Sequence, residues 1–154
     1  MIVVLGDPGS DDVPLADLES FVRTVLDGEG VDHDASVAIE FVDDAAIAAL
    51  NETHMGKNGP TDVLSFPIES ATPGHPPRRR PGGPPIELGD IFISTNVVAA
   101  HASEYEVTLR SEMYLMVCHG VLHLLGWDHQ TDTEAEAMEA REARYLASVG
   151  IERR

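Results

Sequence analysis

The chain has 154 residues, and its 27 acidic residues against 10 lysines and arginines give a formal net charge of −17. This length suits one domain with a sizeable core and is short for two. With 43% hydrophobic and 24% charged residues, the composition is that of a globular protein. No apolar run reaches the roughly 18 residues of a membrane span, and the single cysteine, Cys118, excludes an internal disulfide. We therefore expect a cytoplasmic protein without a membrane partner.

The negative charge is concentrated in the first third of the chain. Residues 1–56 hold 13 acidic residues against Arg23 alone, whereas residues 57–110 hold six acidic and five basic residues. Binding to nucleic acid depends on lysines and arginines that displace counterions from phosphates. The nearly neutral middle of the chain can therefore still form a local basic face, and we take four of its residues as candidate nucleic-acid contacts: Lys57, Arg78, Arg79 and Arg80. The arginine run can equally be a solvated stretch without a defined site.

Strands and helices are expected to alternate through the first two thirds of the chain. The patterns predict strands over Met1–Leu5, Ser36–Val42, Thr61–Ile68 and Leu88–Ser94, a helix over Pro14–Asp27, and a helix from Asp43 or Asp44 to about His54. Residues 70–85 contain six prolines, three glycines and three arginines. Such a segment cannot supply a ladder of hydrogen bonds, so we expect a mobile loop between two strands of one sheet.

Helices dominate the last third. The sequence predicts helices over Thr95–Tyr105 and Thr108–Leu125, and a final helix to about Val149 that opens with the capping box of Thr131 and Glu134. The whole chain, residues 1–154, is thus expected to form a single α+β domain. We expect a mixed sheet of about four strands packed with about five helices.

The most informative stretch is residues 119–129, which read HGVLHLLGWDH. His119 and His123 are four residues apart, so on a helix their side chains project from the same face. Gly126 can end the helix in the left-handed conformation and turn the chain, which lets His129 approach the other two. Three imidazoles with a fourth position left open are typical of a catalytic zinc site. Nickel or iron would accept the same ligands.

The same spacing occurs in the metzincin proteases, which gives a competing interpretation. In those enzymes the second position of the motif is a glutamate, the general base that activates the zinc water. Here that position is Gly120, which has no proton acceptor. A peptidase mechanism would therefore lack its base. Asp128, beside His129, is a candidate for orienting a ligand or taking a proton, although it can equally cap the turn.

Four blocks of the sequence together resemble one family. They are FVDDAAIAALN at 41–51, PTDVLSFP at 60–67, LGDIFIS at 88–94 and the histidine block. In this order they resemble the YbeY family of bacterial endoribonucleases and rRNA maturation factors. The resemblance implies a zinc ion held by His119, His123 and His129, and cleavage of single-stranded RNA in the 3′-end maturation of small-subunit (16S) rRNA and in ribosome quality control. Expected partners are rRNA, the small ribosomal subunit and its proteins or assembly GTPases, but not DNA.

The chain departs from the family pattern in two places. Family members often carry an arginine in a Tyr-Arg-Gly-Lys context before the PTDVLSF block, where this chain has Met55. A role in gripping phosphate must then pass to Lys57, to the arginine run, or to nothing. The proline-rich segment is also longer and more basic than in the family. A non-catalytic ribosome assembly factor with a structural metal therefore remains an alternative to the nuclease.

Overall fold

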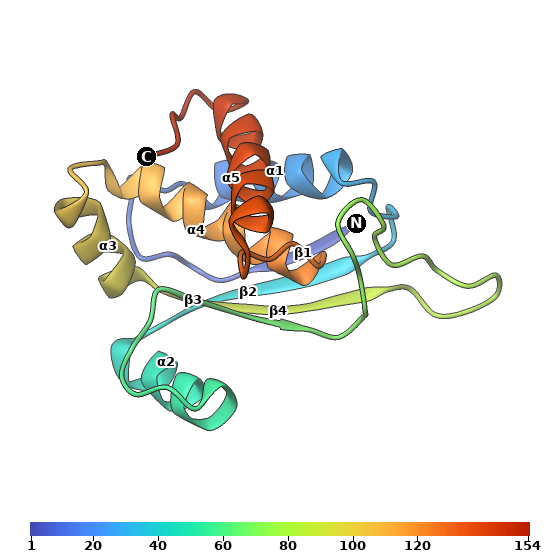
Figure 1. Cartoon of the computed structure of the whole chain (residues 1–154), viewed down its shortest axis with the longest axis horizontal. Coiled ribbons are helices and arrows are strands. Elements are labelled where there is room, and N and C mark those ends of the chain that lie inside the picture. The colour runs from blue at the N-terminus through green and yellow to red at the C-terminus, as the bar shows by residue number, and fades with distance from the viewer.

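A four-stranded mixed sheet forms the centre of the protein, which is described over residues 1–154 by a computed structural model (Figure 1). The strands are β1 (Ile2–Leu5), β2 (Ser36–Val42), β3 (Val63–Pro67) and β4 (Glu87–Ser94). Their order across the sheet is β1-β2-β4-β3; the first three are parallel, and β3 pairs antiparallel with β4. The expected α+β domain is therefore confirmed, and β3 forms one edge of its sheet.

Five α-helices surround this sheet: α1 (Leu15–Gly28), α2 (Asp44–Leu50), α3 (Thr95–Glu104), α4 (Leu109–Leu124) and α5 (Asp132–Ala147). In Figure 1, α1, α4 and α5 lie on one side of the sheet and α2 lies on the other. The side chains of Asp43 and Thr131 cap α2 and α5 at the expected places, and Thr108 caps α4. No helix is long and apolar enough to cross a membrane.

The core is built around α4. Eleven of its residues are buried, and nine of them, among them Tyr114, Val117 and Leu122, belong to a cluster of 30 buried hydrophobic residues. A helix that is apolar on nearly all sides must be covered on nearly all sides. Here the sheet, α1 and α5 cover it. The partly exposed histidines of α4 are therefore exceptions on an otherwise buried helix.

The helix expected to run to about His54 changes its geometry at Asn51. Residues Asn51–Met55 form a π-helical segment, η1, which ends at Gly56 with φ of 64°. The Asn51 side chain is 5% exposed and donates a hydrogen bond to the Gly59 carbonyl at 3.0 Å. The Asn51 carbonyl accepts from the Lys57 amide. These contacts tie the end of the helix to the following loop, which a periodicity analysis of the sequence does not reveal.

Glycine allows α4 to cross the sheet closely at residue 120. A Cβ atom on Gly120 would lie 2.9 Å from Ile91 Cγ2 and 3.2 Å from Val63 Cγ2. The Ser65 hydroxyl donates a hydrogen bond to the Gly120 carbonyl at 3.0 Å. Gly120 thus faces the sheet, and it leaves no space for the glutamate that a metzincin carries at this position.

We predict that Gly120→Ala destabilises the fold. Alanine would gain up to about 1 kcal/mol of helix propensity, but the overpacking against Ile91 and Val63 should cost about 1–3 kcal/mol. Denaturant unfolding of the parent and the variant measures the difference. The double variant with Val63→Ala removes one of the two contacts and should recover part of the loss. A Gly120→Ala protein more stable than the parent would contradict the close approach.

Candidate metal centre

The three histidines of the motif meet at the carboxyl end of α4. His119 and His123 lie one turn apart on the helix, and Gly126, with φ of 93°, turns the chain after it. A Cβ atom on Gly126 would lie 2.3 Å from the Ala71 carbonyl oxygen, so no other residue fits this turn. His129 follows and returns to the helix. One ligand atom from each of the three side chains lies within 4.8 Å of the other two.

The spacing of the ring nitrogens suits a metal ion. The Nε2 atoms of His119 and His123 are 3.0 Å apart. Two nitrogens bound tetrahedrally at about 2.0–2.1 Å from zinc lie roughly 3.3 Å from each other. The His129 ring centre lies 5.3 Å from that of His119 and 5.1 Å from that of His123. Three imidazoles therefore converge, and His129 comes from the exposed side.

The hydrogen bond of the His119 ring and the pKa of the His123 ring also suit a metal. The His119 Nδ1 atom lies 2.8 Å from a carboxylate oxygen of Glu142, an acceptor, so the neutral ring donates through Nδ1 and keeps the Nε2 lone pair free. Burial, followed by the nearby rings of His119 and His129, lowers the pKa of His123 to about 4. A neutral imidazole is the form that binds metal.

The buried carboxylate of Glu29, the residue that follows α1, holds the turn that carries His129. Glu29 accepts a hydrogen bond from Trp127 Nε1 at 2.8 Å and another from the Tyr145 hydroxyl. The Arg141 guanidinium lies over the Trp127 ring, 4.9 Å from its centre, and its Nη1 is 3.5 Å from Glu29. The end of α1, the turn and α5 are thus joined at one point.

Two neighbours of the histidines have structural contacts. The Asp128 carboxylate accepts a hydrogen bond from the His129 amide at 2.8 Å, which is the contact expected of a residue that caps the turn. Cys118 is fully buried, and burial raises the pKa of its thiol. It therefore stays protonated and packs as a small apolar side chain.

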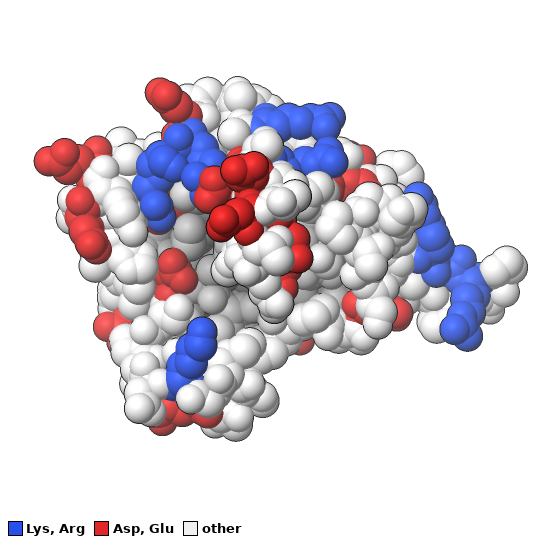
Figure 2. All heavy atoms as spheres, viewed as in Figure 1, with Lys and Arg blue, Asp and Glu red and all other residues white.

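A cavity of about 230 Å³ opens beside the histidines. Its lining comes from α4, α5 and the segments that flank α5: His119, His129, Ala135, Met138, Glu139, Glu142 and Arg153. Figure 2 shows a hollow between the part of the protein that contains α2 and the part that contains α5 and the C-terminal segment, with both basic and acidic side chains around it. The site is therefore open to a ligand from this face.

The four candidate nucleic-acid contacts do not come together. Arg78 and Arg79 form ion pairs with Asp32 and Asp34, in the segment before β2. Their loop extends beyond the end of the sheet, away from α5 (Figure 1). Lys57 and Arg80 are exposed. Two of the four candidate residues, Arg78 and Arg79, thus have their charges neutralised within the fold.

Sequence reasoning missed two residues of this site, Glu142 and Arg153. Glu142 is 1% exposed and lies between His119 and the Arg153 guanidinium. One signal was present in the sequence: Glu142 follows Met138 by one helical turn, on the stripe of α5 that continues with Tyr145 and Leu146. A glutamate on the buried stripe of a helix needs a partner.

Comparison with known proteins shows the family of this chain and agrees with its fold. A family model described as "Endoribonuclease YbeY" matches residues 9–150. A protein of that name from Moorella thermoacetica is 44% identical over 139 residues, which are 90% of this chain and 88% of the relative. The one from Bacillus subtilis is 33% identical over 99% of this chain and 98% of its own length. The solution structure of TM1509 from Thermotoga maritima superposes with a TM-score of 0.65 at 28% identity, over 97% of this chain and 89% of that one. The chain belongs to the YbeY endoribonuclease family.

Proposed function

We propose that this protein is a zinc-dependent endoribonuclease that cleaves single-stranded RNA during 3′-end maturation of 16S rRNA and in ribosome quality control. Family membership supports the nuclease activity. The observation that carries the metal dependence is the convergence of His119, His123 and His129, whose ligand atoms lie within 4.8 Å of one another. Three neutral imidazoles are a donor set that zinc favours, and they leave a coordination position open.

The residues of the chain divide the work of such a site. When bound, zinc supplies Lewis-acid chemistry toward a phosphoryl oxygen and generates a nucleophile from water at neutral pH. Glu142 orients the His119 ring, and the Glu29–Trp127 contact holds the turn that presents His129. The cavity beside His119 and His129 receives the scissile phosphate. Asp128 is the nearest carboxylate in sequence and is our candidate for accepting a proton.

The charge of the chain favours an RNA that is presented by a larger particle. A net charge of −17 repels free nucleic acid at long range, and Arg78 and Arg79 already have acidic partners. We propose that Lys57 and Arg80 make the RNA contacts of this chain. We propose that the protein works in the cytoplasm. There the small ribosomal subunit, with its proteins or an assembly GTPase, would bring the single-stranded substrate to the cavity beside the histidines.

Each of the variants His119→Ala, His123→Ala and His129→Ala should lose the metal. Elemental analysis should find near one zinc ion per chain in the parent and little in each variant, since two imidazoles bind far more weakly than three. Cleavage of a single-stranded rRNA fragment should fall at least about 100-fold, given the several kcal/mol that metal catalysis contributes. His33→Ala is the matched control, because the side chain of His33 is 93% exposed and lies outside the cluster.

Two outcomes would contradict this proposal in different ways. Equal, metal-insensitive cleavage by the parent and by His119→Ala would show that the nuclease activity does not come from this centre. A folded variant that binds no metal yet restores 16S rRNA processing in cells would identify a non-catalytic assembly factor instead.

We also predict a pH dependence that comes from His123. The pKa of His123 in the folded protein is about 4, below the ordinary 6.5. Between pH 4 and pH 6.5, His123 is therefore protonated in the unfolded chain but neutral in the folded protein. The stability contributed by neutral His123 is complete above pH 6.5 and is lost progressively as the pH falls toward 4. An NMR titration of the metal-free protein should place the midpoint of the His123 ring near 4. A midpoint near 6.5 would show that the ring is not buried among its neighbours.

A further inference from the structure

One buried carboxylate connects the histidine cluster to the C-terminal segment. We infer that Glu142, held in place by Arg153, is a positioning residue that fixes the ring orientation and the tautomer of His119. The inference rests on the proposed metal site, in which the Nε2 atom of His119 binds the metal. The three residues come from α4, α5 and the segment after α5, so only the folded chain brings them together.

Glu142 has both of its carboxylate oxygens in use. Oε2 lies 2.8 Å from His119 Nδ1, and Oε1 accepts a hydrogen bond from Arg153 Nε at 3.1 Å. The residue is 1% exposed and lies beside Met138 on the buried stripe of α5. A buried charge is costly unless it is paired and hydrogen-bonded. The two contacts meet that requirement, and they aim one oxygen at His119.

The contact with His119 decides which ring nitrogen carries the proton. An ionised carboxylate can only accept hydrogen bonds, so neutral His119 must place its proton on Nδ1. Its Nε2 atom then presents a lone pair 3.0 Å from the Nε2 atom of His123. A carboxylate behind a ligand imidazole also raises the basicity of that ligand. Glu142 thus prepares His119 before any metal arrives.

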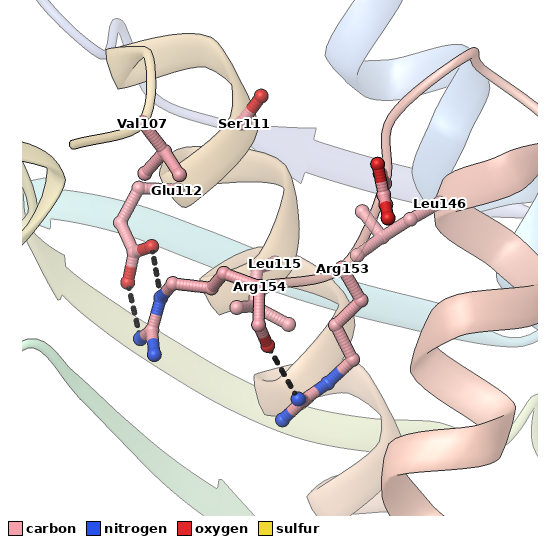
Figure 3. Close-up of a pocket in the computed structure, with 8 residues that line it drawn as sticks. Val107, Ser111, Glu112, Leu115, Leu146, Arg153 and Arg154 are labelled. Carbon is pink, nitrogen blue, oxygen red and sulfur yellow. Dashed lines mark hydrogen bonds and ion pairs between the residues drawn. The ribbon is translucent and has the colours of Figure 1, made fainter. Parts of the chain in front are cut away.

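Arg153 is held in place by acceptors of the protein itself. Its Nη1 donates to the Arg154 carbonyl at 2.8 Å, and its Nη2 lies 3.8 Å from Glu139, so each of the three guanidinium nitrogens has an acceptor of the protein nearby. The neighbouring residue, Arg154, anchors the backbone of this segment. Figure 3 shows that its Nε and Nη2 atoms donate to the two carboxylate oxygens of Glu112, each at 2.7 Å. Glu112 is itself 1% exposed. The segment after α5 is therefore held in place, and it positions Arg153 against Glu142.

The test compares Glu142→Gln with Glu136→Gln. Both substitutions remove one carboxylate from α5, but Glu136 is exposed and outside the site. In the parent without metal, nitrogen-15 NMR of the imidazoles should find His119 as the Nδ1–H tautomer. Glu142→Gln should populate the Nε2–H tautomer, because the amide can also donate to Nδ1. Its zinc affinity should fall about 10–100-fold, whereas Glu136→Gln should match the parent in both measurements.

Arg153→Gln provides a second variant that does not place a new group against His119. The Arg153 side chain is 23% exposed, and the zinc affinity of this variant should fall in the same direction as that of Glu142→Gln but by less. The thermal midpoint of each metal-free variant shows whether it folds.

Two results would overturn the inference. Parent-like tautomer and parent-like zinc affinity in folded Glu142→Gln would make the Glu142–Arg153 contact a purely structural ion pair. An Nε2–H tautomer of His119 in the parent would show that Glu142 does not select the proton position. A parent that binds no zinc would instead contradict the proposed function. The tautomer measurement needs no metal, so it distinguishes a failure of the proposed function from a failure of this inference.

Discussion

The site depends on the burial of α4. This helix is covered by the sheet, by α1 and by α5, and at Gly120 it touches the sheet with no space for a side chain. Because the helix cannot shift or rotate without opening the core, the positions of His119 and His123 are fixed by the packing of the helix. Rigid support of this kind is what a metal site needs from its scaffold. Only His129 is placed by a turn, and that turn is held by Gly126 and by the contact of Trp127 with Glu29.

Part of the strong negative charge of the chain is paired with arginines inside the fold. Glu29, Glu112 and Glu142 have side chains that are 0–4% exposed, and each meets an arginine. Asp32 and Asp34 meet two more arginines of the proline-rich loop. Several cations that the sequence offers for RNA are thus committed to carboxylates of the same chain. The remaining acidic surface favours binding through a protein or a ribosomal particle over capture of free RNA, in line with the proposed setting of the reaction.

Local patterns were sufficient to predict most of the fold. Alternation and helical periodicity predicted the four strands and five helices, and the caps at Asp43 and Thr131 accept the hydrogen bonds expected of them. The histidine cluster was equally accessible, because an i, i+4 pair and a glycine turn define its geometry within eleven residues. The YbeY blocks then led to the family that the comparisons show.

Contacts between distant parts of the chain escaped the sequence. Glu142 and Arg153 are 23 and 34 residues away from His119, and no local pattern reports which face of α5 meets α4. The pairing of Arg78 with Asp32 spans 46 residues in the same way. The π-helical segment η1 was missed because the partner of Asn51, the Gly59 carbonyl, lies in the loop beyond the helix, where helical periodicity gives no signal. The mobility of residues 70–85 and the catalytic role of Asp128 remain predictions.

The central claim is that three imidazoles hold one metal ion and leave a coordination position free. Anomalous scattering at the zinc edge, from crystals of the zinc-loaded protein, tests it most directly. The account predicts a single strong peak per chain at about 2.0–2.1 Å from the ring nitrogens of His119, His123 and His129, with no fourth protein ligand. A peak elsewhere, or a fourth protein side chain that closes the coordination sphere, would contradict it.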